Sequence, residues 1–206
     1  MKLTIIINHH RTPETLLKCL EALKKELKSV DYEIIITESE AEEETAGLIS
    51  RKYPDVLYIG NSKNVGFSKI VNPALEKASG EYLFIINADI IVKNEKSLID
   101  MIDYLEKHED AGVIGPKLLN IDGSIQQSYF REYTPLTILA RRTFFGKTSL
   151  GKKYLDWFSY KDKGGLNKPL EVEWLMGSAL LLERKRFEKI GGKFDERFFM
   201  YFEDAD

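Results

Sequence analysis

Short apolar runs alternate with amphipathic stretches through the first 115 residues, and this alternation restricts the fold more than any other feature. Because the runs are nearly continuous in Ile, Val, Leu and aromatic residues, we expect strands buried on both faces. Strands of this kind joined by helices predict an α/β fold with a doubly wound, mostly parallel central sheet. The expected strands span residues 3–7, 32–37, 56–60, 82–86 and 113–115, and the expected helices span 13–28, 42–52, 68–79 and 96–108.

The pattern changes after residue 119. A turn at 121–124 and a short helix at 135–145 come first, and the polar, Lys- and Gly-rich residues 146–169 predict an irregular excursion. We then expect a last core strand at 178–182 and a short helix at 184–190. The whole chain, 1–206, is therefore interpreted as one domain with two halves, 1–119 and 120–206, and a small additional β element.

Composition limits the classes of function. Hydrophobic residues make up 43% of the 206 residues, so a sizeable core is expected, and the net charge of −3 argues against nucleic acid as the main partner. The single Cys19 provides neither a disulfide framework nor a cysteine metal site. The first seven residues predict a buried strand rather than a signal peptide, and no stretch approaches the roughly 18 apolar residues of a membrane span. We expect a cytoplasmic location.

Polar residues follow four of the expected strands, at 8–11, 37–40, 61–64 and 87–89. In parallel sheets ligands bind at the carboxyl ends of the strands, so these positions are candidates for chemistry. Asp89 lies between two apolar runs, where a carboxylate is costly to bury unless it is paired or bound to a cation. The other interpretation is a turn in which Asn87 or Asp89 caps local backbone, and the residues alone leave both open.

The carboxy-terminal run, residues 194–206, interleaves acids with Phe, Met and Tyr. Carboxylates beside apolar walls have raised pKa values, which suits proton transfer. An aromatic core edge followed by an acidic helix start explains the same residues, and the physical argument alone favours that second explanation.

Three stretches in this order, covering nearly the whole chain, resemble family 2 glycosyltransferases with the GT-A fold, especially the bacterial rhamnosyltransferase-like branch. The stretches are Ile5-Ile6-Ile7-Asn8 with residues 16–23, then residues 61–67 with Asn72, Gly80 and residues 86–89, and finally residues 174–182 with residues 191–206. The last stretch is highly specific, and the Asn-Val-Gly-Phe element at 64–67 is moderately so.

The resemblance implies a site for a nucleotide sugar. Residues 87–89 correspond to the metal-binding Asp-x-Asp element, with Asn87 in place of the first acid and Asp89 as ligand of a Mg²⁺ or Mn²⁺ ion on the donor diphosphate. Glu38 takes the place of an aspartate that contacts the base or ribose, although Glu38-Ser39 departs from the usual Asp-Asn. The other implied donor-binding residues are Asn8 and His10 at the nucleotide entrance, Asn64, Gly66 and Phe67 in the pocket wall, and Met176 and Gly177 beneath the sugars.

The resemblance also implies the reaction. Asp204 corresponds to the base that takes a proton from the acceptor hydroxyl as it attacks the anomeric carbon, and Asp206 is the alternative. One displacement inverts the configuration at that carbon. The implied donor is a dTDP- or UDP-sugar, and the implied acceptor is a saccharide or lipid-linked glycan.

Two other classes of nucleotide-binding enzyme lack their characteristic motifs in this sequence. A dinucleotide-binding dehydrogenase needs a glycine-rich turn after its first strand, and residues 8–13 contain no glycine. A nucleotidylyltransferase needs a glycine- and arginine-rich loop near the start, which is also missing. Because residue 206 lies inside the catalytic motif, we expect a truncated chain with an incomplete acceptor side. The alternative function is therefore a catalytically weak or inactive nucleotide-sugar-binding module.

Cations and aromatic residues lie close together between residues 141 and 158. Peripheral contact with anionic lipid at the inner face of the membrane is one interpretation, and a solvated loop that covers the core is the other. The residues concerned are Arg141, Arg142, Lys152 and Lys153 with Phe144, Phe145, Trp157 and Phe158.

Overall fold

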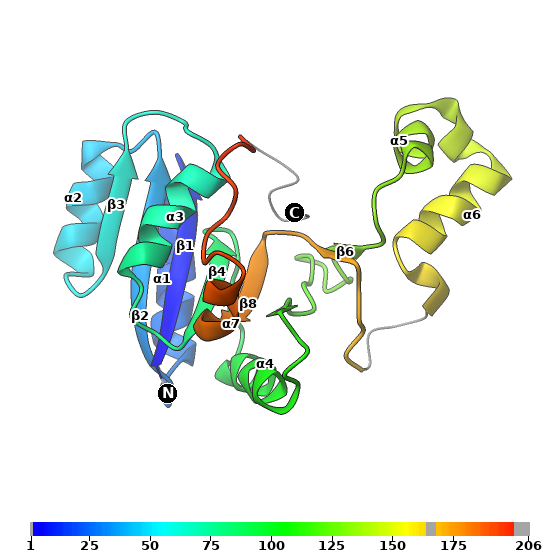
Figure 1. Ribbon diagram of the computed structural model, residues 1–206. Coiled ribbons are helices and arrows are strands. Elements are labelled where there is room, and N and C mark those ends of the chain that lie inside the picture. The colour runs from blue at the N-terminus through cyan, green and yellow to red at the C-terminus, as the bar shows by residue number, and fades with distance from the viewer. Residues whose placement is uncertain (1, 164–167, 200–206) are drawn as a thin grey trace. The chain divides into compact units, whose positions relative to one another are not determined.

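The computed structural model describes residues 2–163 and 168–199, which form two compact units (Figure 1). The first unit holds residues 2–116 and 177–199, and the second holds 117–163 and 168–176. This division differs from the predicted halves 1–119 and 120–206. The reason is that strand β8 (Ala179–Glu183) pairs with the main sheet, so the chain returns to the first unit after residue 176.

The first unit is built on a six-stranded sheet with the order β3-β2-β1-β4-β8-β5. Five of the six strands run in the same direction, and only β8 is antiparallel to its neighbours, which confirms the predicted mostly parallel sheet. Each expected strand is present within a few residues of its predicted ends. The bounds are β1 (Lys2–His10), β2 (Asp31–Ser39), β3 (Leu57–Asn61), β4 (Tyr82–Asn87) and β5 (Val113–Ile114).

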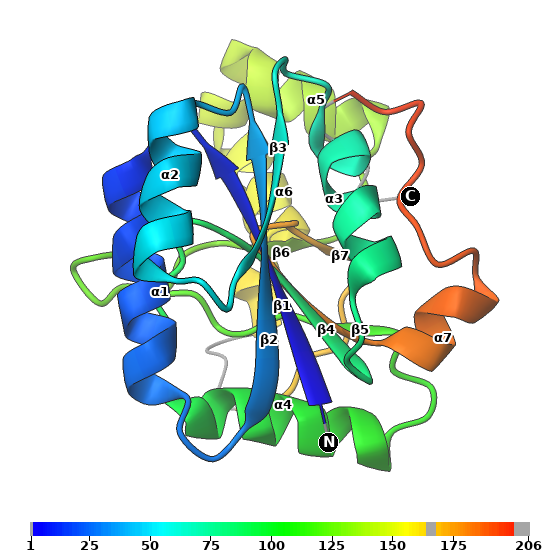
Figure 2. The same ribbon diagram turned by 90° about the vertical axis from the view of Figure 1, so that its left-hand side faces the viewer.

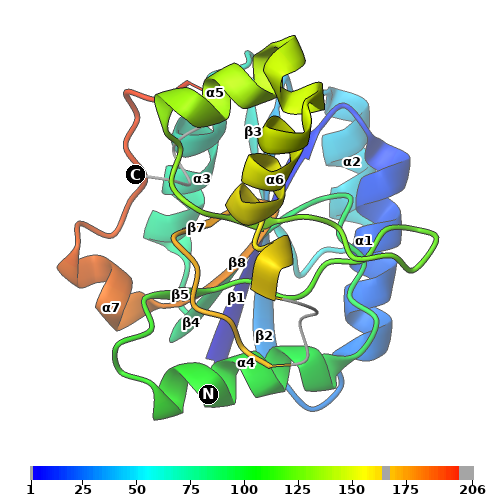
Figure 3. The ribbon, with the colours of Figure 1, turned by 90° about the vertical axis from the view of Figure 1, so that its right-hand side faces the viewer.

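Helices cover both faces of this sheet (Figures 2 and 3). Helices α1 (Pro13–Glu26) and α2 (Glu43–Lys52) lie on one face, and α3 (Phe67–Lys77) and α7 (Arg184–Lys189) lie on the other. Helix α4 (Glu95–Lys107) follows β4 in the chain. The chain moves outward from β1 to β3 and then crosses back to β4 on the other side of β1. The strand order therefore reverses between β1 and β4, where α/β sheets form their ligand crevice.

Side chains of alternate strand residues fill the core on both faces of the sheet. On one face, Ile6, Ile35, Leu83 and Ile85 pack in one cluster with Val71 of α3. Because side chains alternate along a strand, Ile5 and Ile7 point to the other face, where they are fully buried. The Leu residues that recur at helical spacing in α1 are fully buried too. Burying one such side chain stabilises the folded state by about 1.5–3 kcal/mol, which favours apolar side chains on both faces of the sheet.

The second unit contains the small additional β element that the sequence predicted. Strands β6 (Tyr129–Phe130) and β7 (Trp174–Leu175) form an antiparallel pair. The helical elements are α5 (Pro135–Arg142), α6 (Ser149–Phe158) and the 3₁₀ turns η1 (Phe144–Lys147) and η2 (Lys161–Lys163).

Helix α6 corrects the prediction of an irregular excursion over residues 146–169. Leu150, Tyr154 and Trp157 recur at helical spacing, and Thr148 caps the helix by accepting a hydrogen bond from the Gly151 N–H at 3.1 Å. Gly146 and Gly151 are packing residues rather than loop residues, because a Cβ on either would collide with the carbonyl oxygen of Ala140 or Phe145. In the part of the chain that the structure describes, no helix is long and apolar enough to cross a membrane.

Candidate functional site

The carboxyl ends of β1 and β4 bring Asn8 and Asn87 side by side, since these residues are partners in the parallel register. A turn after β4 then presents Asp89. The Ala88 N–H donates to the Asn8 carbonyl at 2.9 Å, and the Ile90 N–H donates to the Asn87 carbonyl at 3.1 Å. Both asparagines are half-buried and Asp89 is exposed. Asn8 and the 87–89 element, which were predicted from different stretches of the sequence, therefore lie at the two neighbouring strand ends where the strand order reverses.

Asp89 is the metal-binding candidate. Within residues 2–163 and 168–199, no three His, Cys, Asp or Glu side chains lie close enough together to form a protein-only metal site. Mg²⁺ seldom needs one, because it commonly binds one or two carboxylates together with substrate phosphates and water. An exposed carboxylate at a strand end fits a dication of that kind. The negative charge of Asp89 also acts on the buried Cys19 thiol. Burial is the larger cause, and the charge of Asp89 the smaller one, of a rise in the pKa of this thiol to about 12.

A buried polar cluster joins the carboxyl ends of β1 and β2 to Tyr58, the second residue of β3. Glu38 has a fully buried side chain, and its Oε1 lies 2.9 Å from Nδ1 of His9 without the alignment of a regular hydrogen bond. The Tyr58 hydroxyl donates to Oε2 of the same carboxylate. Nε2 of His9 accepts a hydrogen bond from the Thr12 N–H at 2.9 Å. A Cβ on Gly60 would lie 2.7 Å from the Cβ of Ala41 and 3.1 Å from the Tyr58 ring, so the glycine allows both side chains to pack there.

This cluster bears on the predicted contact between Glu38 and the base or ribose. Both carboxylate oxygens already face a side chain, and none of the carboxylate is exposed to solvent. Burial and then the hydrogen bond to Glu38 raise the pKa of Tyr58. The carboxylate of β2 thus contacts side chains of both neighbouring strands, and His9 in turn accepts a hydrogen bond from Thr12, the N-cap residue of α1. Direct contact with a nucleotide stays a prediction.

His10, the other residue predicted at the nucleotide entrance, is exposed. Its Nδ1 lies 3.2 Å from the Ser39 carbonyl oxygen, and its Nε2 lies 3.7 Å from a carboxylate oxygen of Glu40. Arg11 pairs with the same carboxylate at 3.2 Å. Arg11 and Glu40 both have positive φ angles, of 50° and 55°, so the two loops after β1 and β2 turn sharply toward each other.

Asn64, Gly66 and Phe67 shape the turn that leads into α3. The Asn64 side-chain oxygen accepts a hydrogen bond from the Gly66 N–H at 3.1 Å, and Gly66 has a φ of +88°. Backbone of the chain itself lies against Gly66. The Phe199 carbonyl lies where a Cβ on Gly66 would sit, and it accepts a hydrogen bond from the Phe67 N–H at 3.3 Å. The Phe67 ring meets Phe194 edge-on, with centroids 5.3 Å apart.

Asn72 has a role that sequence reasoning missed, although it belongs to the stretches that carry the family resemblance. Its buried amide donates to the Phe194 carbonyl and to a carboxylate oxygen of Glu196, both at 3.0 Å. The Phe194 N–H donates back to Asn72 Oδ1 at 2.9 Å. The sequence did contain a signal for this role. Asparagine disfavours the middle of a helix, so a buried hydrogen-bonding role could have been expected for Asn72.

The remaining predicted residues are divided between the first unit, the second unit and the part of the chain outside the described residues. Gly177 lies in the first unit and is half-buried, and the Asn87 N–H donates to the carbonyl of the next residue, Ser178, at 3.0 Å. Met176 belongs to the second unit, where its N–H donates to the Ser128 carbonyl at 2.8 Å. Asp204 and Asp206 lie outside the described residues.

Comparison with known proteins decides the family. The model of glycosyl transferase family 2 matches residues 4–191. The chain belongs to glycosyltransferase family 2. Its relatives include an N-acetylglucosaminyl-diphospho-decaprenol L-rhamnosyltransferase from Mycobacterium tuberculosis, 26% identical over 184 residues, a match that covers 84% of this chain and 58% of the relative. A poly(ribitol-phosphate) beta-glucosyltransferase from Bacillus spizizenii is 26% identical over 66% of this chain and 22% of its own length.

Solved structures confirm the predicted GT-A fold for this family 2 chain. Staphylococcus aureus TarS in complex with UDP matches with a TM-score of 0.65 at 16% identity, over 100% of this chain and 53% of that one. A mannosyltransferase from Pyrobaculum calidifontis in complex with GDP-Man and Mn²⁺ matches with a TM-score of 0.61 at 15% identity, over 98% and 49% of the two chains. The family 2 chain therefore spans about half of each of these two solved chains, of which the TarS chain holds residues 1–349, and 58% of the mycobacterial relative.

Proposed function

We propose that this chain binds a nucleoside-diphosphate sugar and belongs to an inverting glycosyltransferase that acts on a saccharide or lipid-linked glycan. The observation that carries the proposal is the meeting of Asn8, Asn87 and Asp89 at the carboxyl ends of β1 and β4 in a family 2 chain. The crevice is where α/β sheets bind nucleotides, and its exposed carboxylate supplies what a diphosphate-bound cation needs.

Asp89 is the residue proposed to hold Mg²⁺ or Mn²⁺. The mannosyltransferase with a similar fold was solved with Mn²⁺, and the exposed carboxylate here suits a cation that arrives with the diphosphate. Bound in this way, the cation would neutralise charge on the leaving nucleoside diphosphate. Asn8 and Asn87 provide side-chain amides beside it, and Asn87 carries no charge that would compete with the diphosphate.

The proposed donor is a UDP- or dTDP-sugar. TarS, which shares the fold, was solved with UDP and with UDP-GlcNAc, and the mycobacterial relative is named as a rhamnosyltransferase. The acceptor hydroxyl would lose its proton to Asp204, or to Asp206, as its oxygen attacks the anomeric carbon from the side opposite the diphosphate. The bond from that carbon to the diphosphate oxygen breaks in the same step. The product then has the inverted configuration.

A thermal-shift panel tests the donor half of the proposal. UDP, dTDP and GDP are added to the protein with and without Mn²⁺. A ligand at about 100 times its Kd stabilises the native state by about 2.7 kcal/mol, which corresponds to a Tm rise of roughly 5–11 °C for a chain of this size. We expect that rise for UDP or dTDP only when Mn²⁺ is present. A rise of equal size without metal would contradict the role of the cation.

Substitution of Asp89 sharpens this test. In Asp89→Ala the metal-dependent rise should disappear, whereas the matched control Asp110→Ala, which removes an equally exposed carboxylate of the first unit, should keep it. A rise that survives in Asp89→Ala would remove this residue from the site.

A transfer assay separates the enzyme from the alternative, a nucleotide-sugar-binding module without activity. Release of nucleoside diphosphate with formation of a product of inverted anomeric configuration, read by NMR, is the expected result. Asp204→Asn should abolish transfer and leave the thermal shift unchanged. Transfer that persists in Asp204→Asn and stops in Asp206→Asn would assign the base to Asp206.

A further inference from the structure

The second unit carries an exposed apolar surface of its own, which neither the fold nor the donor crevice explains. It lies on the helical hairpin formed by α5, η1 and α6. Phe144 is 80% exposed and Leu150 is 74% exposed, and Ile138, Leu139 and Trp157 each leave more than two fifths of their surface in solvent. Single exposed apolar residues are ordinary, but a group of them on one small hairpin marks an interaction site.

The same segment is rich in cations. Residues 135–163 contain seven Lys and Arg and two Asp, a net charge of +5, whereas the whole chain carries −3. Both aspartates are already engaged, since Asp156 pairs with Lys161 at 3.1 Å and Asp162 pairs with Arg131 at 3.0 Å. Arg142, Lys147, Lys152 and Lys153 are also exposed, and no ion pair with a described carboxylate involves them. The positive charge of the hairpin is thus largely available to a partner.

The hairpin is built to hold these groups in place. Thr134 forms a capping box with Thr137 at the start of α5, and the Tyr154 hydroxyl of α6 lies 2.9 Å and 2.8 Å from their hydroxyl oxygens. Gly146 and Gly151 allow η1 to pack closely against both helices, as described above. The turn that carries Phe144 is therefore fixed between two capped helices, so the exposed ring is presented by ordered backbone rather than by a loose loop.

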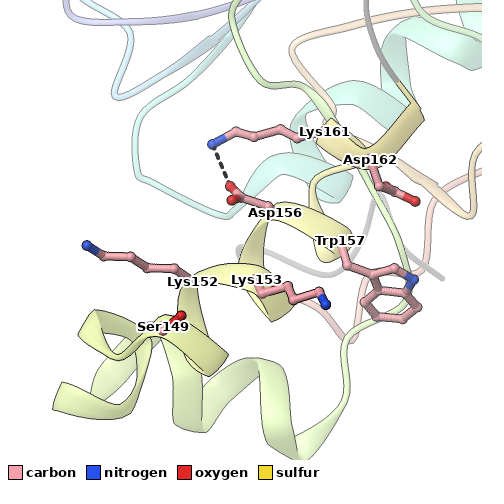
Figure 4. Close-up of a pocket in the computed structure, with 7 residues that line it drawn as sticks. All are labelled: Ser149, Lys152, Lys153, Asp156, Trp157, Lys161 and Asp162. Atoms are coloured by element: carbon pink, nitrogen blue, oxygen red, sulfur yellow. Dashed lines mark hydrogen bonds and ion pairs between the residues drawn. The ribbon is translucent and has the colours of Figure 1, made fainter.

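A hollow of about 520 Å³ adds a place for an anionic group (Figure 4). Lys152, Lys153 and Lys161 line it together with Asp156, Asp162 and Trp157, and Lys161 pairs with Asp156. Figure 4 shows Lys153 beside the indole of Trp157, whereas Lys152 extends to the other side. A lysine without an ion-pair partner beside an indole ring suits a phosphate at the level where polar headgroups meet acyl chains, because Trp prefers that depth.

We propose that the α5–η1–α6 hairpin is a docking surface for an anionic lipid bilayer. Phe144 and Leu150 enter the outer acyl region, Trp157 lies at the headgroup level, and Arg142, Lys147, Lys152 and Lys153 face the lipid phosphates. A soluble polyanion explains the cations alone, whereas a bilayer explains the cations together with the apolar side chains. The surface lies within the second unit, so the inference stands whether or not the proposed donor chemistry is correct.

Vesicle flotation with the purified chain tests the inference. Vesicles of phosphatidylcholine mixed with phosphatidylglycerol should carry the protein upward at low salt, while vesicles of phosphatidylcholine alone should not, and added salt should reduce binding. Each Lys near an anionic surface contributes about 1 kcal/mol, so Lys152→Gln with Lys153→Gln should weaken binding about 30-fold. The control pair Lys77→Gln with Lys107→Gln removes two exposed lysines of the first unit and should change binding less than about twofold.

The apolar residues provide the second arm. Phe144→Ser with Leu150→Ser should also weaken binding to the anionic vesicles about 30-fold or more, since two side chains lose their burial in lipid. Because both side chains are exposed, circular dichroism should show an unchanged fold. Acyl-brominated lipid should quench tryptophan emission, and Trp157→Phe should remove most of that quenching.

Several results would overturn the proposal. Absent or equal binding to the two kinds of vesicle would do so, as would full binding of the Lys152/Lys153 variant. If the Phe144/Leu150 variant kept full binding, the partner would be a soluble polyanion instead. Self-association that the same variant abolishes, without any lipid binding, would assign the surface to a second copy of the chain. The thermal shift with UDP should be unaffected by these variants, so a failure here is distinct from a failure of the proposed function.

Discussion

Replacement of Glu38 by Gln tests whether this carboxylate supports the crevice or contacts the ligand. Gln has the size of Glu, so the substitution removes charge without creating a cavity. Nε2 of His9 accepts from the Thr12 N–H, and the ring proton is therefore assigned to Nδ1, which faces Glu38. The Tyr58 hydroxyl donates to the other oxygen. A carboxylate can face two donors, whereas the NH₂ of Gln must face one of them.

The magnitude follows from what is lost. Hydrogen bonds to charged groups contribute about 1.5–3 kcal/mol, and a buried donor without a partner costs about 1–3 kcal/mol. The loss falls on two contacts of Glu38. One is the hydrogen bond from Tyr58, which is half-buried and can turn to water, and the other is the 2.9 Å contact with the fully buried His9, which lacks the alignment of a regular hydrogen bond. Relief of carboxylate desolvation offsets part of the loss. We expect Glu38→Gln to lower the free energy of unfolding by about 2–3 kcal/mol, or the Tm by roughly 4–12 °C.

Two variants complete the experiment. Glu42→Gln removes an exposed carboxylate four residues away and should change stability by less than about 0.5 kcal/mol. Tyr58→Phe, alone and combined with Glu38→Gln, measures the coupling between the two side chains, which should exceed about 0.5 kcal/mol. Thermal melts followed by circular dichroism give all four values.

A different pattern would refute the reasoning. If Glu38 contacts the base or ribose directly and has no structural role, Glu38→Gln should melt with the wild type and lose at least about tenfold in affinity for UDP. The structural role predicts the reverse, a clear loss of Tm with a smaller change in the affinity of the protein that remains folded.

Three further predictions concern single side chains. Asn72→Ala should lower stability by about 2–3 kcal/mol in a urea melt, because the buried Asn72 side chain loses two hydrogen bonds to the half-buried Phe194 backbone and one to the exposed Glu196 carboxylate. Burial opposes ionisation of Glu33, but hydrogen bonds from Thr4 and Ser79 and the charge of Lys2 lower its pKa below 4.5. The contribution of Glu33 to stability is therefore fully present above pH 4.5, and it is lost as the pH falls through the lower pKa of the folded state. Glu33→Gln should therefore flatten the acid limb of a profile of stability against pH. Cys19, with a pKa of about 12, should react with iodoacetamide at pH 8 only after unfolding.

The sequence was sufficient for most of the sheet. Strands such as β1 and β4 are nearly continuous in apolar residues, and this pattern depends only on local composition. The antiparallel direction of β8 was not predicted, because an apolar run reads the same in either direction. Helix α6 was missed since Gly146 and Gly151 resemble loop residues, although both are present because backbone approaches them closely.

The site was predictable to the extent that it depends on strand ends. Asn8, Asn87 and Asp89 each follow an apolar run, and a parallel register brings such positions together. The burial of Glu38 was not predictable in the same way. It requires His9 and Tyr58 from two other strands, with Gly60 leaving space for the ring, and no local pattern links these four positions.

Helix α3 connects the two segments whose resemblance to the family is strongest. Its first turn begins at Gly66, which follows the Asn64 turn, and Asn72 in its middle holds Phe194, 122 positions later in the chain. Phe199 then returns to the Phe67 N–H. The segment that leads toward the predicted catalytic acids is thus fastened at two places to the helix that follows the predicted donor loop. A movement of that loop on ligand binding would have to move residues 194–199 with it or break these hydrogen bonds, so the two segments should respond to a nucleotide together.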